Sequence, residues 1–308
     1  MTKRVTAALS AVALWMPLQV IAATFLLPPD GESVIGEVLE IESRREHTLS
    51  DLARLYGLGF DEIRLANPEV DPWYPGEGTR IILPRRFVLP DGPREGIVLN
   101  VPEMRLYYYP KPRAGEPATV VTYPVSIGRG DWETPLATTR ITRKKQDPTW
   151  TPPESIRAEH AADGDPLPKV VPPGPDNPLG RHALYLSLPG YLLHGTNRPY
   201  GIGMRVTHGC VRLYPEDVAW LFGDVPTGTP VRIVQQPYKL GRSGNEWFLE
   251  SHPPFDETHD PSRDDLEPLI DALYEVMQGP YGGQVDNRAA FNTARNPTGI
   301  PVRVSSGS

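Results

Sequence analysis

Residues 191–222 read YLLHGTNRPYGIGMRVTHGCVRLYPEDVAWLF: an apolar run ending at His194, a glycine-rich loop and a short helical pattern. This segment contains two of the seven histidines of the chain and its only cysteine, Cys210. Gly209 directly precedes this cysteine, and a residue without a side chain lets the backbone turn sharply or approach a ligand closely. The segment therefore predicts a strand that presents a histidine, followed by a loop that presents a thiol.

Outward from this segment, residues 95–235 consist of short β-type runs separated by proline and glycine. Such runs are typical of a β-sandwich or a barrel, and the helical pattern among them is limited to about residues 215–222. We therefore predict a mainly β domain, sandwich-like or barrel-like, over residues 95–235. The expected strands are Ile97–Val101, Met104–Tyr109, Ala118–Ile127, Thr138–Thr142, Ala183–Leu188, Tyr191–His194 and Pro230–Val234.

A long connection between residues 143 and 181 is dense in proline. Connections of this length without regular structure are usually binding loops, lids or disordered linkers. Trp150, Ile156 and Leu167 lie within it, and these apolar side chains favour a flap packed on the domain over a free linker.

The start of the chain reads as an export signal. Lys3 and Arg4 precede an apolar run that ends in two alanines, which is the order of a secretory signal peptide over residues 1–23. No later stretch is long and apolar enough to span a bilayer, so we expect an exported, periplasmic protein. Residues 24–36 are expected to be a turn-rich lead.

Residues 37–84 form a small α+β pattern, strand, helix, helix and strand. Thr48 is the expected N-cap of a helix that Gly57 ends, a second helix fits residues 60–66, and residues 79–84 form the closing strand. The segments HTLSDLARLYGLGFDEIRLANP and GEGTRIILP resemble the lysin motif, a module that binds glycans containing N-acetylglucosamine. The resemblance implies a peptidoglycan-binding module; a helical spacer packed on the enzyme is the alternative.

The C-terminal extension, residues 236–308, contains a strand-like run at 247–250 and an amphipathic helix candidate at 266–277. We expect weak order from Gly279 onward and treat the extension as a brace on the β domain of residues 95–235.

Composition narrows the possible partners. The 308-residue chain has a formal net charge of −7, which is the wrong sign for neutralising a phosphate backbone, so nucleic acid is not an expected partner. A single cysteine cannot form an internal disulfide. On composition alone it would be a small buried apolar residue, but its sequence surroundings favour chemistry.

A thiol attacks as its thiolate and needs a nearby base to lose its proton. A histidine is the natural partner. The oxyanion that forms when Cys210 attacks a carbonyl needs fixed donors, which the backbone N–H groups around Gly209 and Cys210 can supply.

The motifs HGTN and GIGMRVTHGCVRL are similar to the signature of L,D-transpeptidases, and the resemblance extends from about Ile97 to Val234. It implies a mostly β catalytic domain in which Cys210 is the nucleophile and His194 the general base and then the acid. It also implies that the carbonyl of Gly195 orients the imidazole.

The same resemblance supplies the expected oxyanion and substrate-binding set. Thr207 stands where serine is commoner, Arg212 is expected to pair with a substrate carboxylate through its bidentate fork, and Asn197 is expected to fix its loop through hydrogen bonds. The full set is Thr207, His208, Gly209, Arg212 and Asn197.

As the resemblance implies, the donor is a peptidoglycan tetrapeptide stem, cleaved between diaminopimelate and terminal D-alanine. The favoured acceptor is the C-terminal lysine of an outer-membrane lipoprotein, and a second diaminopimelate is the other candidate. β-Lactams, especially carbapenems, are expected inhibitors, and neither a cofactor nor a metal is expected.

Other classes remain open at this point. A hydrolase would use the same Cys210 and His194 with water as the acceptor. A papain-like peptidase would place its cysteine before its histidine, the reverse of the order here. A zinc site built from Cys210, His194 and His208 lacks the usual paired-ligand spacing, and a non-enzymatic wall-binding protein would not need the thiol.

Overall fold

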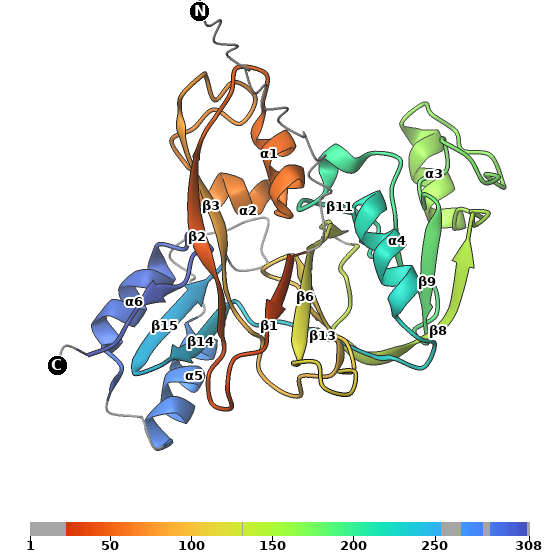
Figure 1. Cartoon of the computed structure of the whole chain (residues 1–308). Helices are drawn as coiled ribbons and strands as arrows, with labels where there is room; N and C mark the ends of the chain where they lie inside the picture. Colours follow the sequence, from red (N-terminus) through yellow and green to blue (C-terminus); the bar gives the residue numbers. More distant parts are fainter. Residues whose placement is uncertain (1–22, 131, 254–265, 280–283, 307–308) are drawn as a thin grey trace, which may run out of the picture.

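The computed structural model describes residues 23–130, 132–253, 266–279 and 284–306. It is a mainly β structure, as predicted, with helices at its periphery. Figure 1 shows the N-terminal hairpin and its helices on one side of the large sheet, and the flap on the other. The expected signal peptide lies outside the described residues, except for Ala23.

The catalytic region is built on a nine-stranded sheet with the order β1-β6-β5-β4-β13-β8-β9-β10-β12. Most neighbours are antiparallel, but β13 runs parallel to β4 and β12 runs parallel to β10. The strands are β1 (Ala23–Leu26), β4 (Gly96–Asn100), β5 (Arg105–Tyr109), β6 (Thr119–Pro124), β8 (Ala137–Gln146), β9 (His182–Leu186), β10 (Leu192–His194), β12 (Val211–Arg212) and β13 (Pro230–Val234).

The sheet curls until the chain just after β6 reaches the edge strand β12. Ser126, just after β6, forms a bridge with Arg212 of β12 through two backbone hydrogen bonds of 2.9 and 3.0 Å. The short strands β7 (Ile127–Gly128) and β11 (Arg205–Thr207) pair beside this bridge. The near-closure explains why a barrel and a sandwich both fitted the sequence.

Apolar side chains from the strands fill the inside of the curl, and helix α4 (Pro215–Asp224) covers one side of it. Val218 and Leu221 of α4 join this core. The predicted helix at 215–222 is therefore confirmed, with proline in its first turn, where the missing N–H costs nothing.

The flap is packed, as predicted, but it contains a helix that the sequence analysis missed. Helix α3 (Glu154–Ala162) buries Ile156, and Trp150 bridges Val171. Asn177 fixes the end of the flap by donating to the carbonyl of Pro148 at 2.8 Å. The surrounding prolines concealed α3, although its own residues favour a helix.

The N-terminal lead is not only a turn-rich segment, which corrects the prediction for residues 24–36. β1 extends the edge of the large sheet, with Ala23 opposite Thr122 and Leu26 opposite Thr119. A four-residue strand is too short to show a clear alternation, so only its pairing with β6 identifies it.

The following unit has the predicted strand, helix, helix and strand order. β2 (Val34–Glu42) pairs with β3 (Arg80–Val88), and α1 (Leu49–Tyr56) and α2 (Phe60–Ala66) lie between them in the chain. Thr48 caps α1 in a reciprocal capping box with Asp51, and Gly57 ends the helix in the left-handed conformation at φ +67°.

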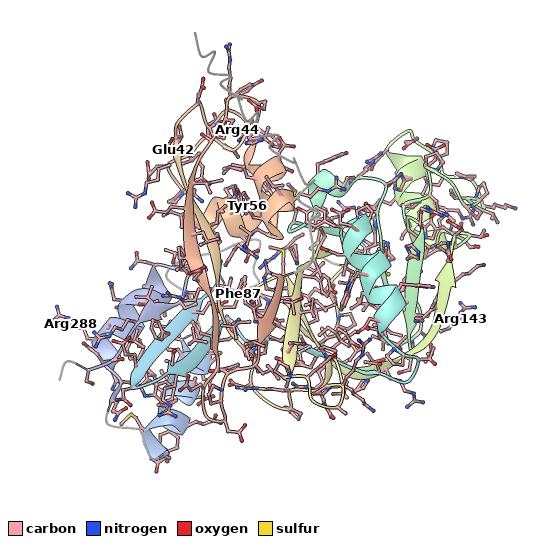
Figure 2. The ribbon with its side chains drawn as sticks, in the orientation of Figure 1. Glu42, Arg44, Tyr56, Phe87, Arg143 and Arg288 are labelled. Carbon is pink, nitrogen blue, oxygen red and sulfur yellow. The ribbon has the colours of Figure 1, made fainter. Side chains whose placement is uncertain are left out.

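This unit shares a hydrophobic core with the large sheet. Phe87 of β3, labelled in Figure 2, packs with Tyr107 and Val120 of the sheet. The fully buried Arg105 donates to Glu62 of α2 and to the hydroxyl of Thr122. Such a buried cation is tolerable because it is paired. The N-terminal unit is therefore packed against the large sheet through a shared core and is not a separate unit on a linker.

The C-terminal region continues this packing. A sheet of β14 (Tyr238–Ser243), β15 (Glu246–Ser251) and β16 (Val302–Arg303) packs with α5 (Glu267–Gln278) and α6 (Asn287–Arg295). The predicted strand and first helix are confirmed, whereas the weak order expected from Gly279 onward is wrong for residues 284–306. Ala290, Ala294 and Val304 are buried in the core of this region.

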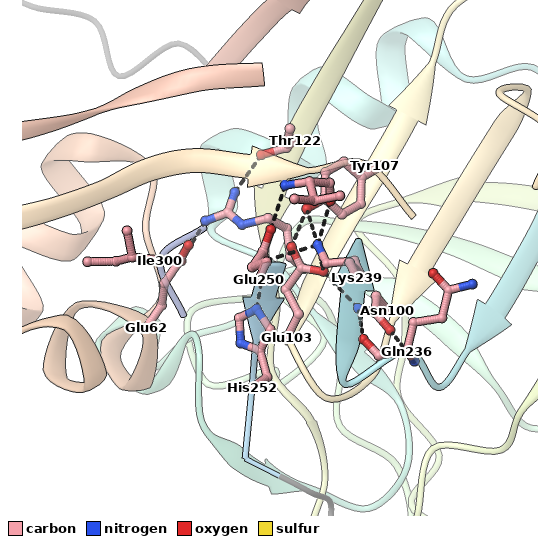
Figure 3. A network of polar contacts seen from close by, with 12 residues as sticks. Glu62, Asn100, Glu103, Tyr107, Thr122, Gln236, Lys239, Glu250, His252 and Ile300 are labelled. Atoms are coloured by element: carbon pink, nitrogen blue, oxygen red, sulfur yellow. Dashed lines mark hydrogen bonds and ion pairs between the residues drawn. The ribbon is translucent and has the colours of Figure 1, made fainter. Parts of the chain in front are cut away.

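A buried ionic network joins the extension to the rest of the molecule (Figure 3). Lys239 Nζ lies 2.8 Å from Glu103 and 3.0 Å from Glu250, and donates to the carbonyl of Val88 at 2.6 Å. Burial acts to raise the pKa of Glu250, but Lys239 and His252 outweigh it and hold that pKa below its ordinary value. One ammonium thus connects the tail, β3 and the large sheet.

Within the described ranges, no helix combines the length and the apolar composition needed to cross a membrane.

Lys239→Met should lower the free energy of unfolding by about 3–5 kcal/mol, because it removes the ammonium that lies between two buried carboxylates, Glu103 and Glu250. Urea unfolding of the full chain measures this. Arg303→Met is the matched control, since Arg303 pairs with Glu246 at the surface and such pairs contribute less than about 1 kcal/mol. Equal effects of both substitutions would contradict a structural role for the network.

Candidate active site

Strand register brings the predicted reactive residues to one face of the sheet. His194 on β10 lies beside Arg212 on β12, and Leu193 lies beside Val211. Leu193 and Val211 point into the core. Because successive side chains alternate between faces, His194 and Arg212 face the other way. Cys210 directly precedes β12 and is close enough to Arg212 for the charge of the guanidinium to act on the thiol.

His194 is held in one tautomer by its neighbour. The ring is 3% exposed, and its Nδ1 lies 2.7 Å from the carbonyl oxygen of Gly195. A carbonyl only accepts, so Nδ1 carries the proton and Nε2 is left with a lone pair. Burial, and then the charge of Arg212, lower the pKa of His194 to about 3. Contacts with the backbone of Gly195 and Leu179 act against this shift. A neutral imidazole with a lone pair on Nε2 is suited to be a general base.

Cys210 is a free, partly exposed thiol whose Sγ lies 3.5 Å from the carbonyl oxygen of Gly190. Its pKa is raised by burial of the sulfur, although a backbone contact with Leu192 and the charge of Arg212 act against the shift. At neutral pH, Cys210 is therefore a thiol and His194 a neutral imidazole.

The turn before the thiol is fixed by Thr207. Its buried hydroxyl donates to the carbonyl of Cys210 at 2.6 Å and accepts from Gly209 N–H at 3.2 Å. The Gly209 N–H, expected to face the oxyanion, is directed at this hydroxyl instead. Gly209 has φ +93°, and a Cβ there would lie 3.0 Å from the ring of Tyr191, so glycine is required by both conformation and space.

A hydroxyl that the sequence analysis did not select supports this turn from the other side. Thr134 Oγ1 donates to the carbonyl of Gly209 at 2.9 Å and accepts from Gly128 N–H at 3.0 Å. Thr134 is distant in sequence from the motif and has no local signal of its role.

His208, expected to shape the pocket, is tied to the flap. Its Nε2 lies 2.8 Å from Glu159 of α3, and its ring packs edge-on against Trp132 at a centroid distance of 4.9 Å. Glu159 also pairs with Arg129. The sequence analysis identified neither Glu159 nor Arg129, because the flap helix that brings them together was not predicted.

Arg212 carries a buried donor close to Cys210. Its Nε is buried and lacks a hydrogen-bond partner among the residues that the structure describes. Burial lowers the pKa of its guanidinium, and the proximity of Cys210 counters the shift. A buried donor of this kind favours an acceptor from outside the chain.

Asn197 is exposed. The hydrogen bond that holds this turn comes instead from the buried Thr196, whose hydroxyl accepts from Arg198 N–H at 2.9 Å. The loop-fixing role predicted for Asn197 therefore belongs to its neighbour.

Residues 94–233 match the model of the L,D-transpeptidase catalytic domain. The probable L,D-transpeptidase YcfS of Escherichia coli K12 is 41% identical over 96% of this chain and 92% of its own length. The probable L,D-transpeptidase ErfK/SrfK of the same strain is 38% identical over 94% of this chain and 93% of its own length.

This chain belongs to the L,D-transpeptidase family. Among solved structures, L,D-transpeptidase 3 from Mycobacterium tuberculosis matches 51% of this chain and 67% of its own, with 20% identity and a TM-score of 0.34.

One group of possible metal ligands occurs in the described part of this transpeptidase, away from the motif. Ligand atoms of Glu103, Glu250 and His252 lie within 4.8 Å of one another. Lys239 already places an ammonium between the two carboxylates. The lysine thus supplies the positive charge that a cation would bring.

The raised pKa of Cys210 predicts how its alkylation depends on pH. Because the thiolate forms only at high pH, the rate of iodoacetamide alkylation of the free enzyme should still rise above the ordinary thiol range of about 8–9. Intact-mass spectrometry follows the reaction without ambiguity, since Cys210 is the only cysteine. A plateau below pH 7 would instead show a thiolate–imidazolium pair in the resting enzyme.

Proposed function

We propose that this L,D-transpeptidase cleaves the bond between diaminopimelate and D-alanine in a tetrapeptide stem through a thioester on Cys210. The observation that carries the proposal is the register of β10 and β12, which places His194 beside Arg212, with Cys210 directly before β12. It supplies a nucleophile, a base with a free Nε2 and a cation for a substrate carboxylate.

In the first step, Cys210 Sγ attacks the carbonyl carbon of the L-centre of diaminopimelate, and His194 Nε2 takes the thiol proton. The pair is neutral at rest, so this proton moves as the S–C bond forms and not beforehand. The N–H of Cys210 is the remaining backbone donor for the oxyanion, since Gly209 N–H is directed at Thr207.

Collapse of the tetrahedral intermediate breaks the C–N bond, and the imidazolium passes its proton to the departing amine of D-alanine. An acceptor amine then attacks the thioester and gives its proton to Nε2, which returns it to the thiolate. The new amide replaces the old one, so no ATP, cofactor or redox partner is needed. Arg212 holds a carboxylate of the stem through its fork.

For the acceptor, we favour the C-terminal lysine of an outer-membrane lipoprotein over a second diaminopimelate. The arrangement of signal peptide, lysin-like unit, catalytic domain and C-terminal extension resembles the lipoprotein-anchoring subgroup. The signal-like residues 1–23 support export to the periplasm, where both substrates are found.

We further propose that the β2–α1–α2–β3 unit binds the glycan of the wall. An open hollow of about 520 Å³ lies on it, and Figure 2 labels three of its lining residues. Trp73 and Tyr74, 54% and 85% exposed, offer aromatic faces on the same unit. The residues that line the hollow are Ile41, Glu42, Arg44, His47, Leu52, Leu55 and Tyr56.

The reaction products distinguish a transferase from a hydrolase and identify the acceptor. The protein lacking residues 1–23 is incubated with tetrapeptide muropeptides and a lysine-ended lipoprotein peptide, and the products are weighed by mass spectrometry. We expect release of D-alanine and a muropeptide–lysine adduct, both absent with Cys210→Ala. Muropeptide dimers would shift the acceptor to diaminopimelate, tripeptide alone would indicate a hydrolase, and no turnover would contradict the proposal.

A carbapenem should acylate the same thiol, because its strained lactam carbonyl is an electrophile that needs no leaving amine. Intact mass should rise by one inhibitor per chain in the native protein and stay unchanged in Cys210→Ala. Arg212→Met should slow acylation by about tenfold or more if the guanidinium binds the inhibitor carboxylate. An equal rate in Arg212→Met would exclude that contact.

A further inference from the structure

The flap reaches the nucleophile loop through a single carboxylate. Glu159 on α3 and His208, two residues before Cys210, are 49 positions apart in the chain, and their Oε2 and Nε2 atoms lie 2.8 Å apart. Both side chains are partly exposed, with 30% and 16% of their surface accessible. The contact therefore lies at the edge of the site, where the flap meets the loop.

This contact determines which ring nitrogen of His208 carries a proton. A carboxylate can only accept, so Nε2 must carry the hydrogen. Arg129 Nη2 is also 3.5 Å from Nε2, but a guanidinium can only donate, so the two contacts cannot both be hydrogen bonds. The shorter one to Glu159 prevails, and Arg129 pairs with the same carboxylate.

The cluster also holds the backbone of the nucleophile loop. Arg129 N–H donates to the carbonyl of Thr207 at 3.0 Å, and Trp132 packs edge-on against the His208 ring. Glu159 is thus connected to the turn at residues 207–210 both through the imidazole and through Arg129. Within the loop, the Thr207 hydroxyl fixes the same turn.

We propose that Glu159 is a positioning residue of the transpeptidation site, which fixes the tautomer and orientation of His208 and holds the flap against the loop that carries Cys210. This inference rests on the proposed function for its effect on the reaction. Its geometric part, the tautomer of His208, does not depend on turnover.

Removal of the carboxylate should slow acylation of Cys210 by about tenfold, because small misplacements of a reacting group have effects of at least this order. The variants are Glu159→Ala and Glu159→Gln, whose amide oxygen can still accept from Nε2. Glu154→Ala is the matched control, since Glu154 lies on the same helix and pairs with Arg157 at the surface.

Two readouts are measured on the full chain. The first is the rate of carbapenem acylation, followed by intact mass, in the three variants, in His208→Ala and in the Glu159→Ala/His208→Ala double variant. The second is the ¹⁵N spectrum of labelled histidine, in which the His208 signal is assigned by its loss in His208→Ala.

We expect Glu159→Ala to slow acylation and to release His208 into a mixture of tautomers. Glu159→Gln should restore at least part of both properties, and Glu154→Ala should change neither. The double variant should lose less than the combined losses of Glu159→Ala and His208→Ala, because a large part of the effect of Glu159 passes through that ring.

An unchanged His208 spectrum in Glu159→Ala would overturn the proposal, and so would additive losses in the double variant. If the native protein is not acylated at all, the proposed function fails, but the tautomer shift still decides whether Glu159 positions His208.

Discussion

The backbone pairing of Ser126 with Arg212 is the constraint on which the site depends. It joins the segment after β6 to the last strand of the nine-stranded sheet, so a sheet that would otherwise stay open curls into a nearly closed form. The same pairing fixes the backbone of Arg212. Since β12 is only two residues long, its position beside β10 would be weakly determined without a partner on its other side.

Buried charge fixes the peripheral parts to this sheet. Arg105 connects it to α2 through Glu62, and Lys239 connects it to the C-terminal extension through Glu103 and Glu250. Isolated ions are costly in a protein interior, so each of these groups is acceptable only when its partner is in place. The pairs therefore specify one arrangement of the parts as well as contributing to stability.

Features that depend on residues close together in the sequence could be predicted from the sequence. The Thr48 cap and the Gly57 stop define α1, and the HGTN and HGC motifs made His194 and Cys210 the candidate reactive residues. β1 was missed because four residues acquire a structure only by pairing with β6. Helix α6 was missed although it places Ala290, Thr293 and Ala294 on one buried face, because these small side chains give a weak apolar signal in the sequence.

The candidate site likewise combines residues that a local motif predicts with residues that only the fold brings together. Its reactive atoms follow from the motif, whereas the groups that hold them come from distant segments, with Thr134 behind Gly209 and Glu159 beside His208. No spacing rule connects residues that meet only after the flap folds. The exchange of roles between Asn197 and Thr196 is a smaller case, because either neighbour could have satisfied the same turn.

The contact between Gly59 and Gly203 has a mechanical consequence. A Cβ on Gly203 would lie 2.3 Å from Gly59 Cα, and the N–H groups of Phe60 and Asp61 donate to the carbonyls of Ile202 and Gly203. The first turn of α2 thus touches, backbone to backbone, the loop that joins the histidine strand to the thiol. A pull on the small N-terminal unit would be transmitted to that loop without a flexible joint to absorb it.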